Sequence, residues 1–198
     1  MHVLETDRLR LRRFTIDDAD FILDLLNQPS FLRNIGDKGV RTTEDARGYI
    51  LDGPVASYEK NGFGLYMVEL KSSGAEIGMC GLVNREALED VDIGFAFLPQ
   101  FWGHGYAVES ASAVMNVERQ TLALDRIVAI TSPDNHASIK VLENIGMRFE
   151  RMIQFSEDEP EIKLFSAVFL RLRAGPDITA VQCAEAPNTG HLAALKPV

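Results

Sequence analysis

The sequence lacks three features that would each assign it to a special class of protein. It has two cysteines in 198 residues, Cys80 and Cys183, too few for a disulfide framework and compatible with a reducing compartment. No segment approaches the ~20 consecutive apolar residues of a membrane span. The N-terminus has no basic segment followed by an apolar one, as a signal peptide would have. We therefore expect a cytoplasmic protein that does not enter a membrane.

Positive charge is also scarce. The chain has 20 Lys and Arg against 29 Asp and Glu, which gives a formal net charge of -9. Broad nucleic-acid binding needs a basic face, so we expect no nucleic-acid partner. An acidic protein suits a cationic substrate, such as a free amine. The hydrophobic fraction of 46% and the charged fraction of 25% are ordinary for one globular domain of this length.

Apolar periodicity predicts strands and helices in alternation. Predicted strands cover residues 8–12, 63–70, 76–84, 91–97, 126–131, 147–155 and 162–170, and predicted helices cover 19–28, 43–58, 107–122 and 136–145. Pro29 is expected to end the first helix, and Gly53-Pro54 can interrupt the second. The early strands should pair as antiparallel hairpins, whereas residues 91–131 should form a right-handed crossover with parallel strands. These elements predict a mixed α/β sheet.

The chain changes character beyond Arg173. Glycine and proline punctuate residues 174–198, and no hydrophobic period is visible there. We therefore expect residues 1–173 to form a single domain and 174–198 to form a poorly ordered tail.

The most informative segment is the turn between the predicted strand 91–97 and the helix that follows. Gly103-His104-Gly105 lets the backbone approach a ligand and leaves unpaired amides at a helix start, which favours a phosphate group. A dinucleotide is one candidate, although Val108 stands where the third glycine of its fingerprint belongs. A nucleoside triphosphate is disfavoured because no Gly-Lys-Ser/Thr follows the turn.

Coenzyme A is the third candidate, and here the sequence resembles a known family. The segment Gln100-Phe101-Trp102-Gly103-His104-Gly105-Tyr106-Ala107 resembles the Q/R-x-x-G-x-G/A diphosphate-binding motif of the GNAT acetyltransferases. Residues 135–147, which read NHASIKVLENIGM, resemble the second signature of that family. Residues 4–12, which read LETDRLRLR, resemble the opening of the branch that includes the ribosomal-protein N-terminal acetyltransferases. These matches occur in the expected order over about residues 4–170.

The resemblance implies a fold and a cofactor. The fold is an α/β structure of the α+β type, with a mostly antiparallel central sheet, helices on both faces and a parallel strand–helix–strand unit at the cofactor site. The cofactor is acetyl-CoA, and no metal is expected. The residues implied in cofactor binding are Phe97, Leu98, Gln100, Gly103, His104, Gly105, Tyr106, Ala107, Asn135 and Ser138. Among these, the backbone of Phe97 and Leu98 would face the thioester.

Deprotonation of the acceptor amine calls for a carboxylate. Asp92 is the first candidate, because it shares a strand face with the small residues Gly94 and Ala96. Glu109 is the second, with a helix-dipole or capping role as the alternative. Many relatives place a tyrosine near the leaving thiolate, where this chain has Leu142, so Ser138 is the nearest hydroxyl. Ser138 is thus a candidate acid, or part of a helix cap.

The predicted function is transfer of an acetyl group from acetyl-CoA directly to a primary amine of a protein N-terminus or a small molecule. A catalytically silent acyl-CoA-binding sensor or scaffold is the alternative, as is a dinucleotide-dependent enzyme. The resemblance also allows a homodimer through sheet edges. The acceptor groove is expected from residues 27–60 and the final hairpin.

Overall fold

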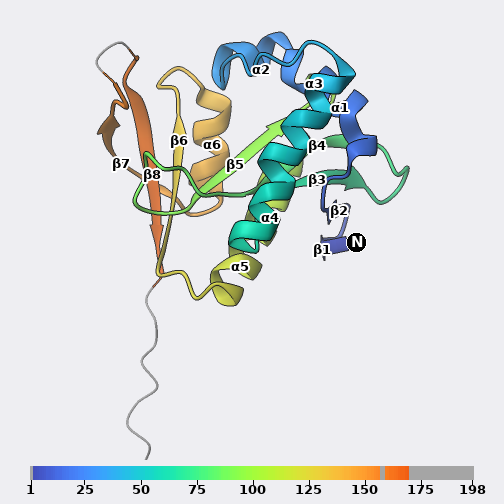
Figure 1. The fold of residues 1–198 in the computed structure, drawn as a ribbon. Helices are drawn as coiled ribbons and strands as arrows, with labels where there is room; N and C mark the ends of the chain where they lie inside the picture. The colour runs from blue at the N-terminus through green and yellow to red at the C-terminus, as the bar shows by residue number, and fades with distance from the viewer. Residues whose placement is uncertain (1, 157–158, 170–198) are drawn as a thin grey trace, which may run out of the picture.

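The computed structural model describes residues 2–156 and 159–169, so the predicted domain end at residue 173, the predicted tail and Cys183 lie outside these ranges. Figure 1 shows the arrangement of strands and helices. Within the described part of the chain, no helix is long and apolar enough to cross a membrane.

The elements follow the predicted order closely. The strands are β1 (His2–Glu5), β2 (Leu9–Arg12), β3 (Leu65–Leu70), β4 (Glu76–Val83), β5 (Asp92–Phe97), β6 (Arg126–Thr131), β7 (Arg148–Ile153) and β8 (Ile162–Val168). The helices are α1 (Ala19–Asn27), α2 (Pro29–Asn34), α3 (Thr43–Ile50), α4 (Ala56–Asn61), α5 (Tyr106–Thr121) and α6 (His136–Asn144).

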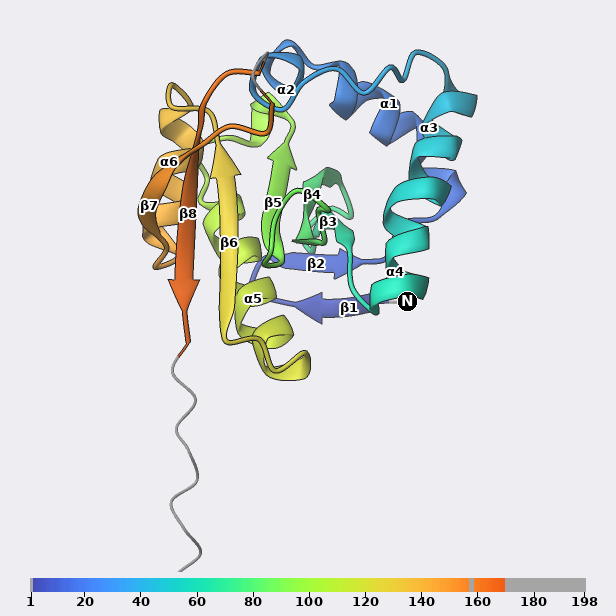
Figure 2. The same ribbon diagram turned by 60° about the vertical axis from the view of Figure 1, so that its left-hand side comes forward.

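The described strands form one sheet in the order β1-β2-β3-β4-β5-β6-β8-β7. Neighbouring strands are antiparallel, with the exception of the parallel pair β5 and β6 that flanks α5. Figure 2 shows α5 and α6 beside β5 and β6, whereas α1 and α3 lie on the other side of the molecule. The predicted fold class is confirmed.

Two hydrophobic cores cover the two faces of the sheet. Met79 and Ala96 pack with buried residues of α1, α2 and α3, whereas Cys80 and Phe97 pack with buried residues of α5 and α6. This alternation is the period-2 pattern of strands that are buried on both faces. A residue's position in β5 therefore tells which helices it faces.

Two elements were not anticipated. One is β1, whose sequence HVLE places two apolar residues side by side, so it shows no polar–apolar alternation. The other is α2: the first helix ends at Asn27, as expected from Pro29, but Pro29 is also the first residue of α2, where its missing amide costs no hydrogen bond. Gly53-Pro54 interrupts the second helix as expected: α3 ends at Ile50, and residues 51–55 form a π-helical turn that joins it to α4.

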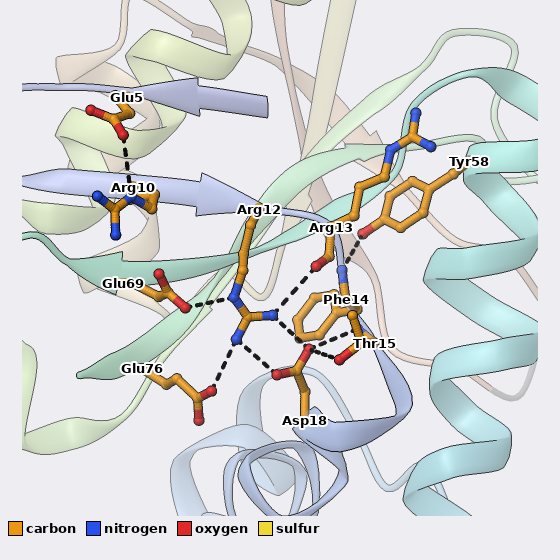
Figure 3. Close-up of polar contacts among 10 residues, drawn as sticks. All are labelled: Glu5, Arg10, Arg12, Arg13, Phe14, Thr15, Asp18, Tyr58, Glu69 and Glu76. Carbon is orange, nitrogen blue, oxygen red and sulfur yellow. Dashed lines mark hydrogen bonds and ion pairs between the residues drawn. The ribbon is translucent and has the colours of Figure 1, made fainter. Parts of the chain in front are cut away.

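Arg12 of β2 ties three strands to the segment before α1 (Figure 3). Its guanidinium donates to Asp18 at 2.7 and 2.8 Å, to Glu69 of β3 at 2.5 Å and to Glu76 of β4 at 3.0 Å. The Arg12 side chain is 17% exposed and Asp18 is 5% exposed. Hydrogen bonding to Asp18 raises the pKa of Arg12, so this guanidinium stays charged at every working pH.

Candidate active site

The glycine turn joins the end of β5 to the start of α5. Gly103 and Gly105 have φ angles of 77° and 81°, in the left-handed region that glycine adopts without strain. The first amide paired inside this helix is that of Glu109, which donates to the Gly105 carbonyl at 3.0 Å. The amides of residues 103–108 have no acceptor among the described residues. This row of donors at the positive end of a helix dipole fits a diphosphate.

Arg8, just before β2, holds the glycine turn in place. Its Nη1 donates to the His104 carbonyl at 2.9 Å, and its guanidinium lies 4.6 Å from the centre of the Tyr106 ring. Glu109 accepts hydrogen bonds from Arg8 Nε at 2.7 Å and from the Thr6 hydroxyl at 2.5 Å. The carboxylate of Glu109, the second candidate base, therefore anchors the N-terminal segment to α5.

This anchoring should show in the pH dependence of stability. Burial raises the pKa of Glu109, but hydrogen bonds from Thr6 and Arg8 outweigh burial, and the net effect lowers the pKa. A lowered folded-state pKa stabilises the fold above about pH 4.3, the unfolded value, and this stabilisation is lost as pH falls through the folded pKa. We expect Glu109→Gln to lower the free energy of unfolding at neutral pH, with a deficit that shrinks in acid. Urea denaturation at a series of pH values measures it.

Glu44→Gln is the matched control, because the Glu44 side chain is 83% exposed. It should change the free energy of unfolding little at any pH. A Glu109→Gln deficit that is the same in acid and at neutral pH would contradict the assignment.

Strands β5 and β6 separate soon after they begin. Their parallel pairing is recorded at Asp92 opposite Val128, where the Val128 amide donates to the Val91 carbonyl at 3.0 Å. Figure 1 shows β6 following β8 while β5 turns away with β4. Beyond Asp92, the edge of β5 that faces β6 is therefore open, and a ligand can reach its backbone.

The end of β5 decides which backbone groups face this opening. The Leu98 amide donates to the Ile77 carbonyl of β4 at 3.0 Å, and its side chain packs with the core of α1 and α3. Because backbone groups alternate between the two edges of a strand, the Phe97 amide points to the open edge. The Phe97 carbonyl accepts from the Trp102 indole at 2.8 Å. Of the two residues predicted to face the thioester, Phe97 is the one whose amide is available.

The start of α6 forms the other wall of the opening. Asn135 is the N-cap, and its side chain accepts from the Ser138 amide at 3.1 Å. The Ser138 hydroxyl has no hydrogen-bond partner within the described ranges. Leu142, at the position where many relatives have tyrosine, is 1% exposed. Capping thus falls to Asn135, and the hydroxyl of Ser138 is left to face a ligand.

Asp92, the first candidate base, is nearly covered. Its side chain is 1% exposed, and Arg85 Nε donates to both carboxylate oxygens at 3.0 Å. Burial raises the pKa of Asp92, and the neighbouring Arg85 offsets part of that rise. Arg85 itself is 39% exposed, so movement of its side chain can uncover the carboxylate.

A cavity of about 930 Å³ joins these parts. Eight of the predicted site residues line it: Asp92, Phe97, Gly103, Gly105, Tyr106, Ala107, Asn135 and Ser138. Leu98, Gln100, His104 and Glu109 are outside its lining. Gln100 and His104 are exposed beside it. Residues of α2 and α3 and of the β7–β8 connection close its far end, which is where the acceptor groove was expected.

Arg85, Lys38 and Tyr49 also line the cavity, and sequence reasoning did not single them out, although Lys38 and Tyr49 lie in the segment 27–60 where the acceptor groove was expected. Each lies outside the glycine turn and the second signature, and neither a single basic residue in a connection nor a tyrosine in a helix has a pattern that distinguishes it. The pairing of Arg85 with Asp92 requires the β4–β5 hairpin to be folded, so only the structure reveals it.

Comparisons with known proteins identify the family of this chain. The acetyltransferase (GNAT) domain family matches residues 8–148. The chain belongs to the GNAT acetyltransferase family. Two Bacillus subtilis (strain 168) relatives are each 30% identical over 154 residues: the uncharacterized protein YkkB, with 76% of this chain and 88% of the relative covered, and the uncharacterized N-acetyltransferase YoaA, with 77% and 86% covered.

Solved acetyltransferase structures share the fold. An acetyltransferase from Agrobacterium tumefaciens str. C58 is 26% identical with a TM-score of 0.71, covering 83% of this chain and 92% of that one. RimL, a ribosomal L7/L12 alpha-N-protein acetyltransferase solved with coenzyme A, has a TM-score of 0.74 at 17% identity, covering 85% and 98%. The predicted family is confirmed. The GNAT match ends at residue 148, before the β7–β8 connection that closes the cavity.

Proposed function

We propose that this protein transfers the acetyl group of acetyl-CoA directly to a primary amine. One observation carries the proposal: the opening beside β5 connects the unpaired amides of residues 103–108 to the buried carboxylate of Asp92. Phe97 packs with the core of α5, whereas Asp92 shares its strand face with Ala96, which packs with the core of α1 and α3. Cofactor and acceptor can thus approach from opposite faces of the sheet and meet in the opening.

The residues present fit the cofactor. Acetyl-CoA, when bound, supplies the acetyl group as a thioester. The amides of residues 103–108 bind its diphosphate without loss of side-chain entropy. The Phe97 amide would donate to the carbonyl oxygen of the thioester. A fixed N–H group that points at the developing negative charge usually gives the largest single stabilisation of the transition state in acyl transfer.

Asp92 accepts the proton of the amine, directly or through a water. A protonated amine has no lone pair for attack, and its pKa is ~8 at a chain terminus and ~10.4 for lysine. Burial raises the pKa of Asp92, which makes its carboxylate the stronger base. Arg85 is part-exposed and stays paired with Asp92 through Nε, and the water lies beside it.

Ser138 holds a proton near the leaving sulfur. Its hydroxyl has no protein partner within the described residues, and it lines the cavity beside Leu142. A thiol has a pKa of ~8.5, so the thiolate can leave with little help from an acid, and this weak donor or a water suffices.

The acceptor is an amine of a protein N-terminus or a small molecule. RimL acts on the ribosomal protein L7/L12 and shares the fold of this chain, which supports an amine acceptor in general. A homodimer belongs to the same proposal, and size-exclusion chromatography with light scattering tests it.

Trp102 provides a direct test of cofactor binding. It is the sole tryptophan, lines the cavity, is 47% exposed and donates to Phe97. We expect coenzyme A to change its fluorescence, and NAD to leave it unchanged. Gly103→Ala should weaken binding of coenzyme A about fivefold, because alanine at positive φ costs about 1 kcal/mol and displaces the amides.

Gly62→Ala is the matched control for that variant. Gly62 has a φ of 80°, and an added Cβ meets nothing within 4 Å at either Gly62 or Gly103. Both variants should lose similar stability, and only Gly103→Ala should lose affinity for coenzyme A. Equal affinities, or a response to NAD instead, would contradict the diphosphate site. Binding of coenzyme A without thiol release on any amine would favour the catalytically silent acyl-CoA-binding domain. The buried carboxylate of Asp92 and the apolar Leu142 are the two features that favour this alternative.

A further inference from the structure

Two basic side chains line the acceptor side of the cavity. Lys38 lies in the connection between α2 and α3, and Arg85 follows β4 and contacts Asp92. The Asp92 side chain lies on the face of β5 that packs with α1 and α3. These cations therefore lie across the sheet from the amides at the start of α5, away from the proposed diphosphate site.

The cations are only partly neutralised. Arg85 donates its Nε hydrogen bond to Asp92, whereas neither Nη atom of Arg85 has a partner within the described residues. Lys38 forms no ion pair with any described residue. Burial lowers the pKa of Lys38, and the nearby positive charge of Arg85 lowers it further. Like charges at one cavity wall are costly unless an anion joins them.

The same cavity also has a negatively charged lining residue. Glu159, in the β7–β8 connection, lines the same cavity and forms no ion pair with Lys38 or Arg85. The cavity thus presents separate positive and negative groups, which suits a ligand with both an ammonium and an anionic group.

We infer that the acceptor is an amine that also carries a carboxylate, which Lys38 and the Nη atoms of Arg85 bind. The inference rests on the proposed acetyl transfer and names the substrate class of that site. The paired Nη donors of arginine match the two oxygens of a carboxylate, and Asp92 fixes the guanidinium from its other edge. Free amino acids and acidic side chains near a peptide N-terminus supply the same chemistry.

The apolar part of the cavity guides the choice of probe. Ile35 and Phe155 are 44% and 40% exposed and both line the cavity, so they can cover a hydrocarbon chain. We would compare kcat/KM for L-leucine and L-leucinamide, and for two tripeptides with glutamate or glutamine at the second position. The first pair reports a free amino acid, and the second pair reports a peptide.

We expect the acid of at least one pair to exceed its neutral partner by about tenfold, the size of a hydrogen bond to a charged group. Leucinamide has the less basic amine and is intrinsically more available for attack, so preference for leucine reports recognition. Lys38→Glu should abolish the preference. Lys60→Glu, at an exposed lysine of α4 outside the cavity, is the matched control and should retain it.

Equal kcat/KM within both pairs, or acetylation of neutral amines alone, would overturn the inference and leave acetyl transfer standing. If no amine is acetylated while coenzyme A still alters Trp102 fluorescence, calorimetry with N-acetyl-leucine and its amide on the CoA-saturated protein decides. Tighter binding of the acid supports the inference, and equal or absent binding overturns it. A missing Trp102 response is a different result, because it contradicts the proposed cofactor site itself.

Discussion

Asp92→Asn should lower kcat for acetyl transfer by about 10²- to 10⁴-fold, the usual contribution of a general base. The amide keeps the shape of the carboxylate and can still accept from Arg85, but it cannot take a proton. Because Asp92 faces away from the α5 core, the affinity for coenzyme A should stay close to that of the wild type. Thiol release measures the first quantity, and Trp102 fluorescence measures the second.

The pH profile sharpens this prediction. Burial raises the pKa of Asp92, so kcat/KM of the wild type should fall as pH drops through a value above the ~3.9 of an ordinary aspartate. The assay should use an acceptor whose amine has a pKa below this range, so that protonation of the amine itself does not contribute to the fall in kcat/KM. The acid limb should vanish in Asp92→Asn. Asp90→Asn is the matched control, because Asp90 pairs with Arg126 near the protein surface. Equal losses of turnover and of affinity for coenzyme A in Asp92→Asn would refute the base assignment.

The glycine turn was predictable because its function depends on backbone geometry that the sequence encodes directly. Two glycines between a strand and a helix require positive φ, and Gly103 and Gly105 have it. Asp92 was identified for a similar local reason, because alternate residues of a strand share one face and Asp92 therefore lies with Gly94 and Ala96. All three residues line the cavity.

Features that depend on the folded sheet or on distant parts of the chain were not predictable. Arg85 reaches Asp92 only because the β4–β5 hairpin places Val83 opposite Asp92. The engagement of the Leu98 amide follows from sheet register, which a single sequence does not reveal. The sequence left Glu109 as either a general base or a helix-capping residue. Its contacts with Thr6 and Arg8 join residues about a hundred positions apart in the chain.

The helical segments show the same division between local and distant causes. Asn135 caps α6 as its residue type favours, because an N-cap contact lies within one turn. Pro29 ends the first helix as expected, but the start of α2 at the same residue was not predicted, since a proline that stops one helix can also begin the next. Pro54 lies within a π-helical turn, where the wider hydrogen-bonding pattern accommodates its missing amide.

Arg12→Met should destabilise the fold by about 3 to 5 kcal/mol, the cost of removing one partner from a buried ion pair. The substitution leaves three carboxylates, those of Asp18, Glu69 and Glu76, without the cation that they share (Figure 3). Burial and the nearby Asp18 already raise the pKa of Glu76, and loss of Arg12 strengthens that repulsion. This cost is a large share of the 5–15 kcal/mol that typically holds a domain together.

Urea denaturation of the two variants Arg12→Met and Arg10→Met separates this network from an ordinary surface pair. Arg10 lies on the same strand and pairs with Glu5, with side chains 34% and 43% exposed, so its loss should cost less than about 1 kcal/mol. The Arg12→Met deficit should also shrink as pH falls, because carboxyls with a raised folded-state pKa favour the folded state once protonated. Similar small losses in both variants, with no dependence on pH, would show that the carboxylates are solvated independently of Arg12.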